Sequence, residues 1–433
     1  MDRILIKPSA LKGAVVPPPS KSLSHRAIIC ASLCSDKEVS RIDNVILSED
    51  INATIDGMRQ LRAEIEIIEN ENKTYCLNIR GGRGSKENNG SKRSVEYAKI
   101  NCGESGSTLR FLIPLSLMLA DRCKFSGKGK LIERPLDIFY KIFDEDGIEY
   151  KNFNGRLPLT VSGKLKGGQY NLSGMVSSQF ISGLLMALPM IDRDSVISVT
   201  DKMESVGYVD LTLQMLKEFN IETINTDYRE FKIPGNSEYK ASSYKVEPDY
   251  SQAAFFLVAD ALGNDVECLG LNEKSLQGDK EIINIIEKFN NSNNSDNNEI
   301  IIDASQIPDL IPIISVLAAL QKGKTTRIVN AQRLRIKESD RLKAVATEMN
   351  KIGAEIEELE DGLIIRGKSA LRGNATVSSW NDHRIAMSLA IAATRCNDEI
   401  VLKGWQAVNK SYPAFWNDYI SLGGAVNGLR MGK

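Results

Sequence analysis

Two cationic side chains, Lys21 and Arg26, lie where the sequence predicts the first turns of a helix. The three prolines at 17–19 impose an extended backbone before that helix, and Ser20 is a favoured N-cap residue. A helix N-terminus is partially positive and disfavours cations, unless an anion binds its free N–H groups. The segment therefore predicts an anion site, although a proline-led helix start with solvated basic residues explains it equally well alone.

Loops rich in glycine and small hydroxyl residues precede two more predicted helices. In residues 103–110 such a loop leads into an apolar helix, and Arg110 lies one turn into it. Ser177 and Ser178 open the apolar helix predicted over 181–190 in the same way. Both loops are typical of an anion cradle, but simple serine capping is an alternative for each.

Two charged segments also precede predicted helices. Lys337 and Arg341 are spaced to share one helical face, with Glu338 beside them. In residues 381–384, Asp382 is placed to cap the next helix and Arg384 falls in its first turn. Taken alone, each segment is also typical of a solvated charge cluster.

Taken together, the cations at helix starts form a pattern. The cations concerned are Lys21, Arg26, Arg110, Arg341 and Arg384. Acidic residues are preferred at such positions, and the sequence shows no evident compensation. Repeated exceptions to this preference for acidic residues indicate a functional site. We therefore expect a highly anionic ligand that carries carboxylate and phosphate groups.

Composition excludes several other classes of protein. The formal net charge of −1 over 433 residues gives no global field that would favour nucleic acid or a membrane. No apolar run is long enough for a signal peptide or a membrane span. Seven scattered cysteines without a Cys-x-x-Cys pair are typical of reduced thiols in a cytoplasm. With only His25 and His383 available, a histidine-rich metal centre is excluded, and we expect neither metal nor cofactor.

The chain repeats one structural pattern. A helical stretch, a turn and a short β-type run recur six times, roughly 60–85 residues apart. The copies lie at 58–67, 142–150, 215–222, 285–289, 349–356 and 419–426. This period predicts six α/β units. Asparagine-rich surface loops are predicted at 86–92 and 290–298, and linkers at 17–19 and 242–248.

In this order, the segments resemble the EPSP synthase family of enolpyruvyl transferases from Lys21 to Lys410. The similarity is carried by Ser-Lys-Ser-x-Ser-x-Arg at 20–26, Gly-x-Ser-Gly-Ser-Thr-x-Arg at 103–110, Glu-Arg-Pro at 133–135, Ser-Ser-Gln-Phe at 177–180, Lys-Glu-Ser-Asp-Arg at 337–341 and Asn-Asp-His-Arg at 381–384. The resemblance implies an α/β protein, a two-domain inside-out α/β barrel with three βαβαββ-type units in each domain. It places one domain at 1–19 plus 246–433, the other at 20–245, and the active site in the cleft between them.

The resemblance implies transfer of an enolpyruvyl group from phosphoenolpyruvate to the 5-hydroxyl of shikimate 3-phosphate, with release of phosphate. It assigns shikimate 3-phosphate to Lys21, Ser22, Arg26, Ser177, Ser178, Gln179, Ser205, Tyr208, Asp309 and Lys337. It assigns phosphoenolpyruvate to Lys21, Gly106, Arg134, Gln179, Arg341, Arg384 and Lys410. No cofactor, nucleic acid or membrane takes part, and a cytoplasmic monomer is expected.

The implied reaction needs a base and an acid in one site. Asp309 is the candidate base for the target hydroxyl, and Glu338 the candidate for protonating the methylene carbon, with Lys21 assisting. Packed cations lower a carboxyl pKa, which favours an ionised Asp309 but opposes a protonated Glu338. The assignment of the two protons stays open at this point.

Two departures and two rival functions accompany the resemblance. Arg333 stands where many relatives have asparagine, and Glu104 where some do. The enolpyruvyl transferases that act on UDP-N-acetylglucosamine have asparagine where Ser22 stands and usually a loop cysteine, for which Cys123 comes too early. A non-catalytic module that binds anionic metabolites is the other alternative, and the retained candidate catalytic residues disfavour it.

Overall fold

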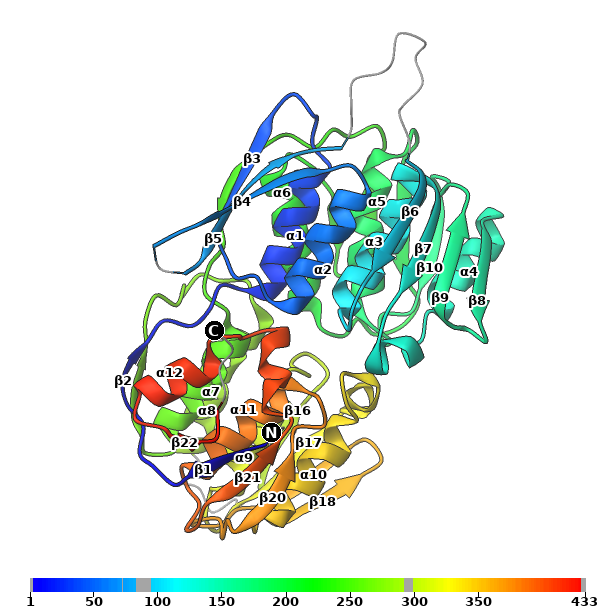
Figure 1. Cartoon of the computed structure of the whole chain (residues 1–433). Helices are drawn as coiled ribbons and strands as arrows, with labels where there is room; N and C mark the ends of the chain where they lie inside the picture. Colours follow the sequence, from blue (N-terminus) through cyan, green and yellow to red (C-terminus); the bar gives the residue numbers. More distant parts are fainter. Residues whose placement is uncertain (1–2, 72, 83–94, 292–298, 430–433) are drawn as a thin grey trace. The chain divides into compact units, whose positions relative to one another are not determined.

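A computed structural model describes residues 3–71, 73–82, 95–291 and 299–429. It is a mixed α/β structure of repeated βα units, as the sequence predicted (Figure 1). The chain divides into two compact units, Pro19–Glu247 and a discontinuous unit of Met1–Pro18 with Pro248–Lys433.

The unit Pro19–Glu247 contains three four-stranded sheets. Its helices are α1 (Lys21–Ser32), α2 (Glu49–Gln60), α3 (Gly106–Leu119), α4 (Asp137–Asp146), α5 (Ser178–Ala187) and α6 (Val206–Glu218). Its strands are β3 (Val39–Val45), β4 (Glu64–Glu69), β5 (Tyr75–Arg80), β6 (Val95–Asn101), β7 (Ala120–Ser126), β8 (Glu149–Phe153), β9 (Arg156–Ser162), β10 (Gln169–Leu172), β11 (Ser195–Val199), β12 (Ile224–Thr226), β13 (Glu230–Ile233) and β14 (Ser243–Lys245).

The three sheets share one topology. Their strand orders are β14-β3-β5-β4, β6-β7-β9-β8 and β10-β11-β13-β12. In each, the first two strands pair in parallel and the remaining pairs are antiparallel. A helix connects the parallel strands of the second and third sheets, α3 between β6 and β7 and α5 between β10 and β11, as a crossover requires.

Helices form the interior of this unit and sheets lie outside them. In α3, every residue from Thr108 to Leu117 is buried, and α5 is buried at all positions except Gln179. A helix that is apolar all round must be surrounded by protein. The strands instead alternate buried and exposed residues, as in β9, so one face of each sheet is exposed. Figure 1 shows α1, α2, α3, α5 and α6 grouped together in this way.

The discontinuous unit repeats the same plan with one reduced sheet. Its helices are α7 (Tyr250–Ala261), α8 (Ile282–Asn291), α9 (Ile311–Ala319), α10 (Arg341–Lys351), α11 (His383–Ala393) and α12 (Phe415–Ser421). Its strands are β1 (Arg3–Lys7), β2 (Lys12–Val15), β15 (Asp265–Cys268), β16 (Glu299–Asp303), β17 (Thr325–Val329), β18 (Ile356–Leu359), β19 (Gly362–Arg366), β20 (Ala375–Ser378), β21 (Ile400–Lys403) and β22 (Ala425–Asn427). The sheets are β16-β17-β19-β18, β20-β21-β1-β22 and the pair β15-β2.

Most local predictions are confirmed. Ser20 caps α1 and Asp382 caps α11 through their side chains. All seven cysteines are free, and Cys30 and Cys34 are buried. The asparagine-rich segment 86–92 and most of 290–298 lie outside the described residues.

One local prediction is wrong. Lys337 and Arg341 do not share a helical face, because Asp340 caps α10 and the helix begins only at Arg341. Lys337 follows the short 3-10 helix η5 (Gln332–Ile336) and has extended backbone. The carboxylate of Asp340 accepts the N–H of Lys343 at 3.1 Å, which fixes this start.

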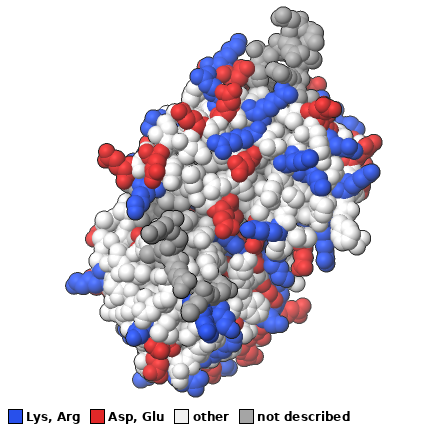
Figure 2. All heavy atoms as spheres, in the orientation of Figure 1, with Lys and Arg blue, Asp and Glu red and all other residues white. Residues whose placement is uncertain are grey.

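Both signs of charge are present on the face of the molecule shown in Figure 2. Lys and Arg side chains are interspersed with Asp and Glu over the face in Figure 2, in agreement with the near-zero net charge. In the described part of the chain, every helix is too short or too polar to cross a bilayer.

Candidate functional site

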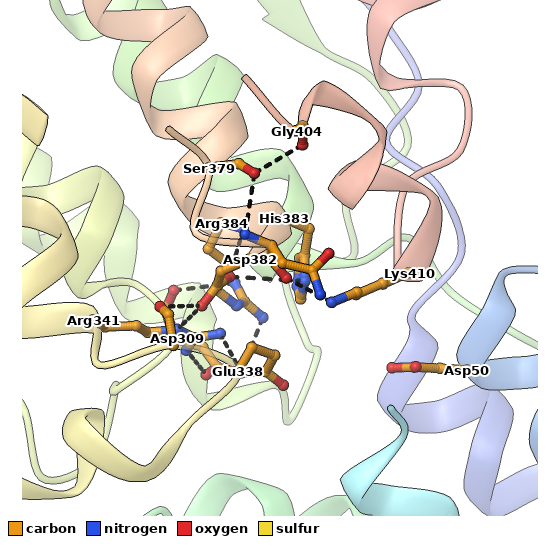
Figure 3. Close-up of polar contacts among 12 residues, drawn as sticks. Asp50, Asp309, Glu338, Arg341, Ser379, Asp382, His383, Arg384, Gly404 and Lys410 are labelled. Atoms are coloured by element: carbon orange, nitrogen blue, oxygen red, sulfur yellow. Dashed lines mark hydrogen bonds and ion pairs between the residues drawn. The ribbon is translucent and has the colours of Figure 1, made fainter. Parts of the chain in front are cut away.

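A buried arginine at the start of α10 holds three carboxylates (Figure 3). The Arg341 guanidinium donates from Nε to Asp382 Oδ2 at 2.9 Å, and from Nη1 to Asp309 Oδ1 at 2.7 Å. Its Nη2 donates to Glu338 Oε2 at 2.8 Å. The Arg341 side chain is only 1% exposed, whereas those of Asp309 and Glu338 are 19% and 20% exposed. Solvent or a ligand can therefore reach these two carboxylates but hardly the guanidinium behind them.

Asp309 is shared between two guanidinium groups. Arg384 Nη2 donates to Asp309 Oδ2 at 2.9 Å, and Nη1 to the Asp309 backbone oxygen at 3.0 Å. Burial alone would raise the pKa of the Asp309 carboxyl, but the charges of Arg384, Arg341 and Lys337 outweigh it. They hold that pKa well below its usual range. Asp309 is thus ionised, with both oxygens bonded to cations.

The start of α11 is built from the same residues. Asp382 Oδ1 accepts the backbone N–H of Arg384 at 2.9 Å, and its Oδ2 also accepts from Ser339 Oγ at 3.0 Å. Lys410, at the end of the 3-10 helix η6 (Trp405–Lys410), donates from Nζ to the Asn381 backbone oxygen at 2.5 Å. The N-terminal turns of α10 and α11 therefore come together with Lys410.

Lys337 lies near this cluster and has altered chemistry. Burial lowers the pKa of the Lys337 ammonium to about 8, and nearby Arg333 and Arg341 oppose its charge while Asp309 favours it. Lys337 is therefore only partly charged in mildly alkaline solution. An anionic ligand beside it would favour the charged form.

In the unit Pro19–Glu247, Lys21 has a counter-charge of its own. Lys21 Nζ donates to Asp50 Oδ2 at 2.8 Å, and both side chains are largely buried. The Thr108 hydroxyl donates to the Asp50 backbone oxygen at 3.4 Å. Since Lys21, Asp50 and Thr108 lie in the first turns of α1, α2 and α3, three helix N-termini meet here.

Arg26 is a buried link between helices. Its Nε donates to Thr212 Oγ1 at 2.7 Å. Its Nη1 donates to the backbone oxygen of Ser22 and its Nη2 to the backbone oxygen of Tyr208, both at 2.8 Å. The guanidinium also lies 5.0 Å from the centroid of the Phe111 ring. Burial lowers its pKa to about 10. Arg26 therefore joins α1 to α6, and a ligand carboxylate would compete with these backbone oxygens.

Gln179 and Gly106 connect the starts of α5 and α3. Gln179 accepts from Arg110 Nη1 at 3.0 Å and donates from Nε2 to Ser107 Oγ at 2.9 Å. A Cβ atom added to Gly106 would lie only 2.6 Å from Arg134 Nη1 and 3.0 Å from Arg110 Nη1. Two guanidinium groups therefore lie against the first turn of α3, and the absent side chain at Gly106 makes room for them.

The remaining candidates lie at the starts of α5 and α6. Ser177 caps α5 by accepting the N–H of Gln179 at 3.3 Å, and Ser178 is the first residue of that helix. Ser205 precedes α6 in a left-handed conformation with φ 55° and is buried. Its backbone oxygen accepts the N–H of Tyr208 at 3.1 Å. Hydroxyl groups at helix N-termini are suited to phosphate.

The expectation that the cations lack compensation is wrong. Lys21, Arg341 and Arg384 have carboxylate partners, and Arg26 and Arg110 have oxygen partners. Most of these partners are distant in sequence, so adjacent residues gave no sign of them. Among the described residues, no group of three or more His, Cys, Asp and Glu side chains is arranged to hold a metal ion.

Sequence reasoning missed two acidic residues of the site. Asp50 is an ordinary acidic residue in a first helical turn, so nothing marked it as the partner of Lys21. Asp279 accepts a hydrogen bond from Ser251, and burial together with the charge of Asp309 raises its pKa to about 6. Only the folded chain brings Asp279 near Asp309.

Comparisons with known proteins agree on one family. A family model described as EPSP synthase (3-phosphoshikimate 1-carboxyvinyltransferase) matches residues 5–419. The chain is 51% identical to the 3-phosphoshikimate 1-carboxyvinyltransferase of Clostridium novyi and 52% identical to that of Clostridium acetobutylicum, each time over 100% of both chains. A solved EPSP synthase from Acinetobacter baumannii is similar in fold, with a TM-score of 0.77 and 24% identity over 99% of both chains.

Proposed function

This chain belongs to the EPSP synthase (3-phosphoshikimate 1-carboxyvinyltransferase) family, and on that premise we propose its reaction. It transfers the enolpyruvyl group of phosphoenolpyruvate to the 5-hydroxyl of shikimate 3-phosphate and releases phosphate. The reaction is a step of aromatic amino acid biosynthesis by the shikimate pathway. The observation that carries the proposal is the Arg341–Asp309–Arg384 cluster at two helix starts. We also propose that the enzyme is cytoplasmic and monomeric.

Phosphoenolpyruvate carries a carboxylate and a phosphate, and five of the seven proposed ligands are cationic. The seven are Lys21, Gly106, Arg134, Gln179, Arg341, Arg384 and Lys410. Arginine donates two parallel N–H groups to a carboxylate or phosphate, which favours Arg341 and Arg384 for this role. Both are fixed by packing before any ligand arrives, so binding costs little side-chain entropy.

Binding of phosphoenolpyruvate exchanges one set of anions for another. In the ligand-free chain, Asp309 and Glu338 occupy the donors of Arg341. A ligand anion that takes these donors loosens the hold of Arg341 and Arg384 on Asp309. Since those cations keep the pKa of Asp309 low, the exchange raises it and makes Asp309 a better base. Binding of phosphoenolpyruvate thereby prepares the base.

The proposed chemical step uses Asp309 as the base and Glu338 as the acid. Asp309 takes the proton of the 5-hydroxyl, whose oxygen bonds to C2 of phosphoenolpyruvate. Glu338 carries a proton once the ligand anion has taken its place at Arg341, and with the assistance of Lys21 it gives this proton to C3. A tetrahedral intermediate forms. Loss of a C3 proton and cleavage of the C2–O bond to phosphate then restore the double bond. The surrounding cations stabilise the charge of the intermediate without having to reorganise.

Shikimate 3-phosphate is assigned to ten residues, most of which lie at or near helix starts. They are Lys21, Ser22, Arg26, Ser177, Ser178, Gln179, Ser205, Tyr208, Asp309 and Lys337. Ser177, Ser178 and Ser205 hold the 3-phosphate, where helix dipoles and N–H groups favour an anion. Ser22 and Arg26 hold the ring and its carboxylate, with Arg26 exchanging a backbone oxygen for the ligand.

A phosphate-release assay tests the function. The protein is supplied with phosphoenolpyruvate and either shikimate 3-phosphate, UDP-N-acetylglucosamine or no acceptor. We expect release with shikimate 3-phosphate only. Release with the sugar nucleotide alone would establish the rival transferase, and no release with either acceptor would support the non-catalytic module.

Two variants test the assigned residues. We expect Lys21→Ala and Asp309→Ala to fold and to lose about 100-fold or more in turnover, the usual effect of removing an acid or base. Glu299→Gln, which changes a solvent-exposed ion pair with Arg327, is the matched charge control. Wild-type turnover in either alanine variant would remove that residue from the mechanism.

A further inference from the structure

Glu348 is a buried acidic residue that the mechanism above does not use. It lies in α10 and is only 1% exposed. Its Oε1 accepts from the indole Nε1 of Trp380 at 2.7 Å, and its Oε2 from the backbone N–H of Ser378 at 3.0 Å. Lys351, one turn along the helix, donates to both oxygens at 2.9 and 2.8 Å. Four hydrogen bonds satisfy a carboxylate that would otherwise be costly to bury.

The segment that Glu348 holds, residues 378–382, has a strained backbone. Trp380 and Asn381 are consecutive left-handed residues, with φ 52° and 55°. Asparagine tolerates this conformation, but for a tryptophan it is costly and persists only where the surroundings impose it. Ser379 contributes by donating to the Gly404 oxygen at 2.8 Å and by accepting the N–H of Asn381 at 3.2 Å.

This segment holds or adjoins three proposed ligands of phosphoenolpyruvate. Its last residue, Asp382, caps α11 and accepts from Arg341 Nε, as Figure 3 shows. The Asn381 oxygen accepts from Lys410, and Arg384 follows in the first turn of α11. A relaxed backbone at Trp380 would therefore shift Arg384 together with the hydrogen-bond partners of Arg341 and Lys410.

We propose that Glu348 is a positioning residue for the phosphoenolpyruvate site. Its carboxylate fixes Ser378 and the Trp380 indole. It thereby imposes the left-handed backbone at Trp380 and Asn381, which orients Asp382 and Arg384. Glu348 touches neither substrate in this account. The inference rests on the proposed function, because it takes Arg341, Arg384 and Lys410 as ligands of phosphoenolpyruvate.

Steady-state kinetics of Glu348→Gln and Trp380→Phe test the inference. An amide cannot accept all four hydrogen bonds, and phenylalanine has no N–H for Glu348. We expect KM for phosphoenolpyruvate to rise about tenfold in both variants, the order that a small misplacement of binding groups produces. KM for shikimate 3-phosphate stays within twofold. Lys351→Ala is the matched control, since it removes the half-exposed partner of Glu348 and leaves the bonds to 378–382.

The outcomes separate positioning from bulk stability. A lower Tm with unchanged KM for phosphoenolpyruvate in Glu348→Gln and Trp380→Phe would overturn the inference. An equal rise of KM in Lys351→Ala would also overturn the inference. It would show that the ion pair between Glu348 and Lys351, and not the bonds to residues 378–382, determines binding. Absence of turnover in the wild-type protein would instead contradict the proposed function.

A spectroscopic measurement does not depend on turnover. The chain has three tryptophans, and Trp380→Phe identifies the indole N–H signal of Trp380 in protein labelled with 15N-tryptophan. In Glu348→Gln we expect that signal to move and its hydrogen exchange to accelerate. An unmoved signal would contradict the assigned contact.

Discussion

At the scale of residues, the cations of this protein carry their own counter-ions. Arg341 and Arg384 hold Asp309, and Lys21 holds Asp50. Isolated buried charges are costly, so a chain that must present several cations to a ligand needs partners for them when the ligand is absent. In the proposed function, a ligand anion replaces these partly exposed carboxylates while the cations stay in position.

Gly106 is expected to set the position of two arginines. A methyl group in Gly106→Ala would collide with Arg134 and push Arg110, so both guanidinium groups must move. We expect KM for phosphoenolpyruvate to rise about tenfold, equivalent to roughly 1.4 kcal/mol of binding, while KM for shikimate 3-phosphate changes little. Steady-state kinetics with each substrate varied in turn measures both values.

The neighbouring glycine of the same loop offers a control. Gly103 has φ 56° and has nothing within 4 Å of an added Cβ. Asparagine tolerates this conformation, so Gly103→Asn should leave both KM values within twofold. Equal effects of the two substitutions would show that the loop, and not the contact with Arg134, determines binding.

Lys337 predicts a pH dependence. Because burial lowers its pKa to about 8, the ammonium loses its charge as the pH rises through that value. If Lys337 binds shikimate 3-phosphate, KM for this substrate should rise above pH 8 with little change in KM for phosphoenolpyruvate. Lys337→Arg keeps the charge and should abolish the rise. A rise that persists in Lys337→Arg would assign the titration to another group.

At the scale of elements, a chain of polar side chains joins three helix starts. His25 Nδ1 lies 2.7 Å from Thr54 Oγ1, and Thr54 Oγ1 lies 2.7 Å from Thr108 Oγ1. Burial and the charges of Lys21 and Arg26 keep the pKa of His25 well below its usual range, so the imidazole is neutral. Neutral hydrogen bonds thus hold α1, α2 and α3 beneath the charged groups.

Loss of the Thr54 hydroxyl should weaken this connection. Thr54→Val keeps the shape and leaves His25 without its partner at Nδ1 and Thr108 without one of its partners. We expect the free energy of unfolding to fall by about 1–3 kcal/mol, the cost of stranding buried polar groups. Urea unfolding followed by circular dichroism measures it. Thr226→Val, at an exposed position of β12, should change it by less than about 0.5 kcal/mol.

Elements and their caps could be predicted because their signals are local. Ser20 and Asp382 directly precede the helices that they cap, and apolar spacing marked the helices themselves. Partners of the cations could not be predicted, since Arg341 and Asp382 lie 41 residues apart and Lys21 and Asp50 lie 29 apart. Spacing alone placed Lys337 on α10, although the cap signal of Asp340 was present in the sequence.

At the scale of the whole molecule, the two units differ in how the chain builds them. Pro19–Glu247 is continuous, whereas the other unit needs residues 1–18. β1 lies between β21 and β22 in its sheet, and β2 pairs with β15. The sequence predicted the repeats, but not which strand pairs with which, because register is settled only in the folded sheet.

Separate fragments should reflect this difference. We expect residues 19–247 alone to unfold cooperatively in urea, because their helices and sheets form one core. Residues 248–433 alone should show no cooperative transition until a peptide of residues 1–18 is added. A cooperative transition of 248–433 without the peptide would contradict the structural role given to β1 and β2.

The central position of β1 has a consequence for the timing of synthesis. Ile4 and Ile6 of β1 are buried, and one of the strands that pairs with β1 is β21, Ile400–Lys403. A ribosome working at about 5–20 residues per second needs roughly 20–80 s to reach those partners. During that time β1 has no partner from β21, while the unit Pro19–Glu247 can already fold. Because β1 is only five residues long, few unpaired backbone groups are open to pairing with another chain.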